Sequence, residues 1–330
     1  MANKIGIQVK DGDLFLNGER YSAGGGNAKN KFNKILVFGT SIETTPATSR
    51  SWSKNMADAL GLEYGTQVKN KARGGGTITW YGTSITNKQV LDVYPGHFLS
   101  AFSCTLEEKQ EMADYYVAQG FLTQEQVDAV KGTSEWNLCY DKSLLEEEDV
   151  DLYIFGTYGI NDRMNYMKWT DNDGNVQTSF TVHRETEFDR RTIYGAYNYV
   201  LRELYRKNPN AKVVILGQHT RQWDGAGVDD EGQPITTART QTGANGSQHS
   251  VARAWNIPFA DWGNHLPLNE SYYLATNRRV TGQTTNRKET VWNQDSVHLT
   301  DLGAELLGRW VADWITKTPL TPLRPTFVTI

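Results

Sequence analysis

The sequence predicts an α/β protein in which helices cover both faces of a parallel sheet of about five strands. Two observations predict this fold class. The stretches 34–39, 151–156 and 211–217 contain short apolar runs that lack the alternation of a half-exposed strand, a pattern typical of strands buried on both faces. Helical patterns lie between most of these stretches, and the alternation of strands with helices indicates parallel connections.

The first expected strand covers residues 34–39 and ends abruptly at Gly39-Thr40-Ser41. A helix-compatible stretch follows at residues 51–60, and a second strand is expected within residues 62–68, before the glycine-rich stretch 70–77. A serine between a buried strand and a helix lies at the carboxyl edge of the sheet, where open α/β sheets bind their ligands. The simpler alternative is that Ser41 only caps a helix, because serine is a favoured cap.

The remaining elements continue the alternation. Strands are expected at residues 151–156, 211–217 and 257–261, and helices at residues 190–206, near 245–255 and after Thr300. The apolar residues of the helix at 190–206 fall on one face, as in a helix that packs against a sheet. Asn208-Pro209 ends that helix, because proline cannot continue it.

One main domain is expected over residues 34–318. Residues 1–33 are expected to form an appendage, in which an Asn-Gly pair indicates a hairpin and three successive glycines indicate a linker. Residues 319–330 contain three prolines and are expected to be an extended tail.

Two stretches, residues 93–149 and 165–187, are too long for simple connections and are interpreted as insertions of helices and loops. Capping-box patterns that begin at Thr105 and Thr123 predict two short helices in the first insertion. Each insertion follows a strand end that carries a candidate site residue, so we expect both to wall the site.

Composition narrows the class of protein. The chain has 330 residues with 38% hydrophobic and 22% charged residues, which allows a substantial core. The net charge of −4 gives no reason to expect nucleic-acid binding. No apolar run is long enough for a membrane span, and the N-terminus lacks the apolar centre of a signal peptide. We therefore expect no membrane partner and leave the localisation open between the cytoplasm and a virion surface.

No metal or cofactor is expected. The two cysteines, Cys104 and Cys139, permit one disulfide without demanding it and do not have the spacing of metal ligands. The sequence also contains no glycine-rich loop followed by Lys-Ser or Lys-Thr, the pattern of a phosphate-binding loop.

Four short motifs fall at expected strand ends or just before the last helix. They are Gly39-Thr40-Ser41, Asn70-x-Ala72-x-x-Gly75-x-Thr77, Gly159-x-Asn161-Asp162 and Asp295-x-x-His298. In this order and context they resemble the SGNH hydrolases, the broad family of GDSL-like esterases and lipases, over roughly residues 34–316. Two positions depart from the family pattern, because Thr40 stands where aspartate is usual and Ala72 where glycine is common.

The resemblance implies a serine esterase on a flavodoxin-like three-layer α/β/α sandwich, acting through an acyl-enzyme without a cofactor. Ser41 needs a base to take its proton, and His298 can supply one. Asp295, three residues earlier, can hold the other ring nitrogen of the imidazole. The resemblance assigns the oxyanion hole to the backbone N–H groups of Ser41 and Gly75 and to the side-chain amide of Asn161.

The substrate expected is an O-acetylated carbohydrate. The chain has ten tryptophans and sixteen tyrosines, many of them in polar loops, and aromatic rings offer flat faces for sugar rings. Candidate substrate-binding residues are Trp80, Tyr81, Trp169, His219, Trp223 and Trp292. One alternative is a lipase or thioesterase for longer acyl chains. Another is a carbohydrate- or receptor-binding module with little turnover, attached to a larger assembly such as a phage tail fibre or spike.

Overall fold

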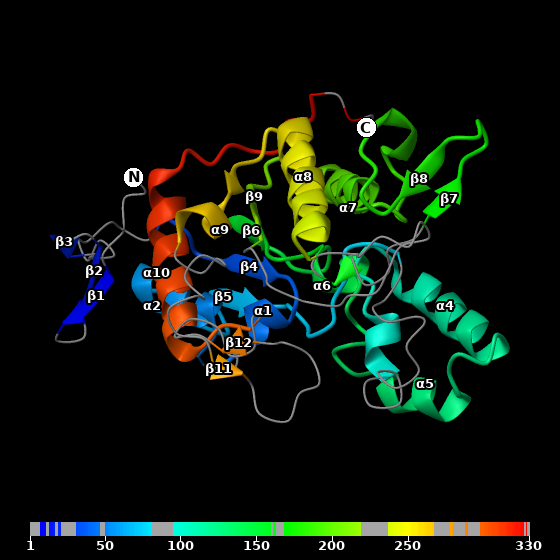
Figure 1. The fold of residues 1–330 in the computed structure, drawn as a ribbon, viewed down its shortest axis with the longest axis horizontal. Helices are drawn as coiled ribbons and strands as arrows, with labels where there is room; N and C mark the ends of the chain where they lie inside the picture. Colours follow the sequence, from blue (N-terminus) through cyan, green and yellow to red (C-terminus); the bar gives the residue numbers. More distant parts are fainter. Residues whose placement is uncertain are drawn as a thin grey trace.

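The computed structural model describes residues 7–10, 13–16, 19–20, 31–46, 50–80, 95–159, 161–162, 168–218, 237–266, 278–279, 288–289, 298–326 and 328. A five-stranded sheet lies at its centre, with helices packed on both faces (Figure 1). None of the helices in these described ranges is both long enough and apolar enough to cross a bilayer.

All neighbouring strands of the central sheet are parallel, which confirms the predicted fold class. In spatial order the strands are β10 (Phe259–Ala260), β9 (Val213–Leu216), β6 (Leu152–Phe155), β4 (Ile35–Phe38) and β5 (Val68–Asn70). The first strand of this sheet, β4, therefore lies second from one edge; β5 is then added at that edge, and β6, β9 and β10 are added in turn on the other side. This is the flavodoxin-like order, whose topological switch point lies between β4 and β6.

Helices α2 (Trp52–Leu60) and α10 (Asp301–Lys317) cover one face of the sheet and pack against each other. The apolar residues of this layer form one buried cluster with alternate strand residues such as Ile35 and Val37. Because side chains alternate between the two faces of a strand, Leu36 and Phe38 belong to the opposite layer.

Helices α7 (Ile193–Lys207) and α8 (Thr237–Trp255) cover the other face, where they lie side by side. The fully buried Trp255 of α8 donates its indole N–H to the Asn198 side chain of α7 at 3.0 Å. The described part of the C-terminal tail also lies against this layer, because Leu323 is buried and its N–H donates to Ala211 at 2.9 Å.

The first insertion has a small core of its own. Its elements are η2 (Pro95–Leu99), α4 (Leu106–Ala118), α5 (Gln124–Val130) and α6 (Tyr140–Ser143). Thr105 and Thr123 both form the capping boxes that the sequence predicts. Cys104 and Cys139 are buried free thiols in this core. The ammonium group of Lys109 is buried beside them and donates to the backbone oxygens of Glu135 and Leu138.

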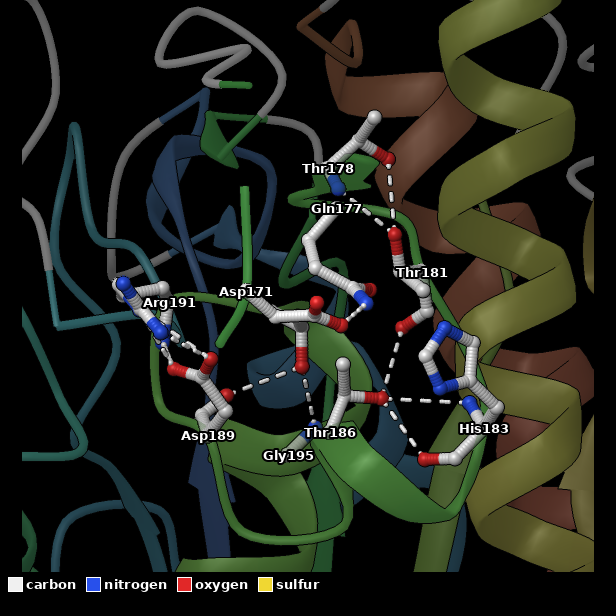
Figure 2. Close-up of polar contacts among 10 residues, drawn as sticks. Asp171, Gln177, Thr178, Thr181, His183, Thr186, Asp189, Arg191 and Gly195 are labelled. Atoms are coloured by element: carbon white, nitrogen blue, oxygen red, sulfur yellow. Dashed lines mark hydrogen bonds and ion pairs between the residues drawn. The ribbon is translucent and has the colours of Figure 1, made fainter. Parts of the chain in front are cut away.

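The second insertion contains a short antiparallel pair, β7 (Lys168–Thr170) and β8 (Val176–Thr178), followed by η4 (Arg184–Thr186). Asp171 lies in the connection between the two strands, and its carboxylate accepts a hydrogen bond from Gln177 at 2.6 Å (Figure 2). Near the start of α7, Asp189 and Arg191 form an ion pair at 2.8 Å.

The remaining described elements are short. Strands β1 (Ile7–Lys10), β2 (Asp13–Leu16) and β3 (Glu19–Arg20) form an antiparallel sheet, so the N-terminal region has one strand more than the expected hairpin. The others are α1 (Ser41–Thr44), α9 (Trp262–His265), and the paired β11 (Arg278–Arg279) and β12 (Lys288–Glu289).

Two element boundaries differ from the sequence-based expectation. The second strand covers Val68–Asn70, so only its first residue lies in the expected range 62–68, because the backbone N–H groups of Gln67 and Val68 both donate to Glu63 in a turn. Helix α8 begins at Thr237, well before the helix expected near residues 245–255. Its first turns contain threonines and a glycine, which are poor helix formers and hide the helix from the sequence pattern.

A partly buried network of charges joins the first insertion to the sheet. The carboxylate of Glu147 contacts the ammonium groups of Lys34 at 2.9 Å, Lys69 at 3.0 Å and Lys71 at 2.7 Å. Burial alone would raise the pKa of Glu147, but the hydrogen bonds from the three lysines outweigh it and lower the pKa to about 2.

We expect Glu147→Gln to destabilise the fold at about pH 7 by about 1 kcal/mol. A depressed pKa contributes stability above the unfolded-state value of about 4.3 and loses it as the pH falls towards the folded-state value. The difference in free energy of unfolding between the two proteins should therefore shrink between about pH 4 and pH 2. Urea titrations at several pH values measure it, and a difference that stays constant over this range would contradict the assigned network.

Candidate active site

Ser41 is the first residue of α1 and lies just beyond the carboxyl end of β4. Its side chain is partly exposed, whereas the preceding Thr40 is buried. The backbone oxygen of Ser41 accepts hydrogen bonds from the hydroxyls of Thr44 at 3.1 Å and Thr45 at 2.8 Å. These contacts hold the turn, so the Ser41 hydroxyl has a defined position at the switch point of the sheet.

The imidazole Nε2 of His298 lies 2.8 Å from the Ser41 Oγ, within hydrogen-bond reach. The two residues are 257 positions apart in the sequence, and the packing of α2 against α10 brings them together. Leu299 is fully buried and Thr300 caps α10, so the residues after His298 are well held. A histidine in this position can take the proton of the serine hydroxyl and so generate a nucleophile.

Several predicted site residues lie outside the described residues. They are Tyr81, His219, Trp223, Trp292 and Asp295. The role of Asp295 as the partner of His298 therefore stays a prediction, as do the substrate contacts of the other four.

Gly75 lies after β5 in a left-handed backbone conformation, with φ of +72°. A Cβ atom at this position would lie 2.6 Å from the ring of His97, a residue of η2. The Gly75 carbonyl accepts a hydrogen bond from the Ser100 hydroxyl at 2.8 Å. Glycine is therefore required here by both conformation and space. Because η2 belongs to the first insertion, that insertion contacts the glycine-rich loop.

The side chain of Asn161 follows β6 and donates a hydrogen bond to the carbonyl of Gly76 at 3.0 Å. This bond uses one of the two N–H donors of the amide, which leaves the other for an oxyanion. The neighbouring Asp162 is fully buried and accepts bonds from the N–H groups of Ile78, Thr79 and Gly159. Burial raises the pKa of Asp162, and these donors act in the opposite direction.

The carboxyl ends of β4, β5 and β6 thus lie at the same edge of the sheet. Ser41, Gly75 and Asn161 belong to the segments that follow these three strands. Asn70 links the first two ends, because its side-chain amide donates to the carbonyl of Glu43 at 2.7 Å. A nucleophile, a base and neutral N–H donors in one place are the groups that acyl transfer needs.

Two of the candidate aromatic residues are covered on one face by arginine. The guanidinium of Arg190 lies 4.1 Å from the ring centre of Trp80, and that of Arg191 lies 4.5 Å from the ring centre of Trp169. Both arginines directly precede α7. Each ring can offer only its remaining surface to a ligand, and the assignment of both residues to substrate binding stays a prediction.

Sequence reasoning missed two residues that lie close to the site. The buried Glu43 belongs to a Thr-x-x-Glu capping box that begins at Thr40, a pattern that is visible in the sequence. His97 has no such signal, because its contact with Gly75 depends on how the first insertion folds back. Burial lowers the pKa of His97, and the Glu135 carboxylate acts in the opposite direction.

The described part of the site holds no metal centre. Within the described ranges, no three His, Cys, Asp or Glu side chains gather as metal ligands would. A hollow of about 530 Å³ lies between the second insertion and helices α7 and α8, lined by Val182, His183, Arg184, Glu187, Tyr194, Ser250 and Arg253. It contains none of the predicted site residues.

The glycine-rich loop provides a matched pair of substitutions. We expect Gly75→Ala to lower the turnover number by roughly a hundredfold, because the added Cβ meets His97 and displaces a backbone donor. Gly74→Ala is the control, since a Cβ at Gly74 meets nothing within 4 Å. Steady-state kinetics of both variants on nitrophenyl acetate should separate them. Equal turnover numbers in the two variants would show that the conformation of the loop at Gly75 does not affect the reaction.

Neither a family model nor a curated protein matches the sequence. Several solved structures are similar to it in fold. A protein from Lactobacillus plantarum is 12% identical, with 87% of this chain and 99% of that chain covered and a TM-score of 0.49. A carbohydrate acetylesterase from Sinorhizobium meliloti is 13% identical, with 86% and 98% covered and a TM-score of 0.43. An aryl esterase from M. smegmatis is 14% identical, with 86% and 98% covered and a TM-score of 0.43.

Proposed function

We propose that this chain is a serine ester hydrolase of the SGNH type. The observation that supports this most directly is the 2.8 Å contact between the Ser41 Oγ and the His298 Nε2 at the switch point of the sheet. The topology also supports the proposal: Ser41 follows β4, and the segments after its neighbours β5 and β6 contain Gly75 and Asn161, the proposed oxyanion donors.

The reaction follows from these groups. His298 takes the proton of Ser41 while the serine oxygen attacks the ester carbonyl, and a tetrahedral oxyanion forms. The backbone N–H groups of Ser41 and Gly75 and the amide of Asn161 stabilise this oxyanion. His298 then gives the proton to the leaving alcohol, which departs and leaves an acyl-enzyme. Water, activated by the same histidine, attacks the acyl-enzyme and releases the acid.

The substrate that we favour is an O-acetyl group on a carbohydrate. Two features support this choice: the aromatic residues of the loops and the polar residues between them, as in Thr-Asp-Asn-Asp-Gly-Asn at 170–175. Polar loops with scattered aromatic rings suit a hydrated glycan, whereas a lipase mouth presents a contiguous aliphatic surface. Among the described residues, the exposed large apolar side chains are the scattered Tyr115, Phe121, Val176 and Val182.

A series of nitrophenyl esters with increasing acyl length tests this proposal. We expect hydrolysis to be fastest for the acetyl ester and to fall towards octanoyl, and we expect acetate to be released from an acetylated polysaccharide. Ser41→Ala is the control, and it should lower turnover by at least about a thousandfold while the fold stays intact.

The outcomes separate the alternatives. Rates that rise from acetyl to octanoyl, with no acetate released from a polysaccharide panel, would move the assignment to a lipase or thioesterase. Glycan binding without hydrolysis of any ester would indicate a binding module. Hydrolysis that persists in Ser41→Ala would overturn the assignment of the nucleophile.

A further inference from the structure

Glu43 has a fully buried carboxylate directly behind the nucleophile turn. Its Oε2 accepts a hydrogen bond from the backbone N–H of Thr40 at 2.6 Å. Its Oε1 accepts one from the backbone N–H of Thr157 at 3.1 Å. The Thr157 hydroxyl lies 3.0 Å from Oε2 and 2.9 Å from the Thr40 hydroxyl, so all the groups around the carboxylate are linked.

The backbone on both sides is shaped around this carboxylate. A Cβ at Gly39 would lie 2.1 Å from the Oε2 of Glu43, and a Cβ at Gly156 would lie 2.5 Å from its Cδ. Gly39 follows β4 and Gly156 follows β6, so both strand ends provide the space that the carboxylate fills. Any larger residue at either position would push the carboxylate out.

The partners of Glu43 are neighbours of the proposed catalytic groups. Thr40 directly precedes Ser41, and Thr157 begins the segment that leads to Asn161. The backbone carbonyl of Glu43 also accepts the amide of Asn70, at the end of β5. One residue therefore joins the three strand ends on which the nucleophile and both other oxyanion donors depend.

Burial of a carboxylate in this setting costs free energy, because the charged group loses its contacts with water. Within the described part of the chain, no lysine or arginine pairs with Glu43, so hydrogen bonds alone compensate its burial. Burial raises the pKa of Glu43, while the donors from Thr40 and Thr157 act in the opposite direction. Buried carboxylates held in this way are concentrated at functional sites.

We propose that Glu43 is a positioning residue for the reaction, a proposal that rests on the ester hydrolase function above. It does not touch the substrate. It fixes the Ser41 turn relative to the end of β6, so that the hydroxyl and the oxyanion donors face the same carbonyl. Its carboxylate also accepts hydrogen bonds from the backbone N–H and the hydroxyl of Thr40, which precedes the nucleophile at the position where the SGNH pattern usually has an aspartate.

The isosteric variant Glu43→Gln tests the proposal. Its amide has one accepting oxygen, so its NH₂ group must face the N–H of Thr40 or of Thr157. The strand ends then shift apart, and small displacements of reacting groups slow the chemical step strongly. We expect kcat on nitrophenyl acetate to fall about ten- to a hundredfold, with KM changed less than about twofold. Active sites are counted by exhaustive labelling with a fluorophosphonate, so that unfolded protein does not contribute.

Thr157→Val is a second variant that keeps the shape and the backbone N–H but removes the hydroxyl. It should lower kcat less than Glu43→Gln, and the double variant should lose less than the product of the two single losses, because both act on one network. Glu147→Gln is the control: it also removes a carboxylate with several partners, one that is partly buried, but it should leave kcat per active site unchanged.

The results distinguish this inference from the proposed function. An active wild type with kcat per active site within about twofold in Glu43→Gln, whatever its melting temperature, would show a purely structural role and overturn the inference alone. If Glu43→Gln does not fold, an unchanged kcat per active site in Thr157→Val would overturn the inference in its place. A wild type that hydrolyses no ester would overturn both.

Discussion

The parallel pairing of β5 and β6 on either side of β4 is the constraint on which the site depends. Parallel strands present their carboxyl ends at the same edge, so the segments that follow the three strands must meet. β4 is the second strand from one edge of the sheet, with β5 on one side and β6 on the other, and the switch point lies just beyond Phe38. Ser41, the Gly75 loop and Asn161 are thus neighbours for a topological reason, before any side-chain contact is considered.

Two further sets of contacts fix the positions of these neighbouring loops and of His298. Buried carboxylates tie the loops together: Glu43 joins the ends of β4 and β6, and Asp162 joins the end of β6 to residues 78–79. The packing of α2 on α10 then brings in His298 from the far end of the chain. The proposed base depends on helix packing, whereas the proposed oxyanion donors depend on loop hydrogen bonds, so the two parts can be perturbed separately.

Local patterns in the sequence predict much of this architecture. The buried strands β4, β6 and β9 show as unbroken apolar runs, and the capping boxes at Thr105 and Thr123 mark helices that the structure contains. The pairing of Ser41 with His298 is suggested by motif order. Long-range contacts were not predictable: Glu43 contacts Thr157 across 114 residues, and the arginine that covers Trp80 comes from a distant segment. Such contacts depend on tertiary packing, which no local pattern encodes.

We propose that Ser41 is a nucleophile activated by its position. Labelling of the wild-type protein with a fluorophosphonate, followed by mapping of the modified peptide by mass spectrometry, tests this role, because only an activated serine reacts with such a reagent at a useful rate. We expect one label for each chain, on Ser41, with loss of ester hydrolysis in proportion to labelling. A label on another residue, or full hydrolysis by protein labelled at Ser41, would contradict it.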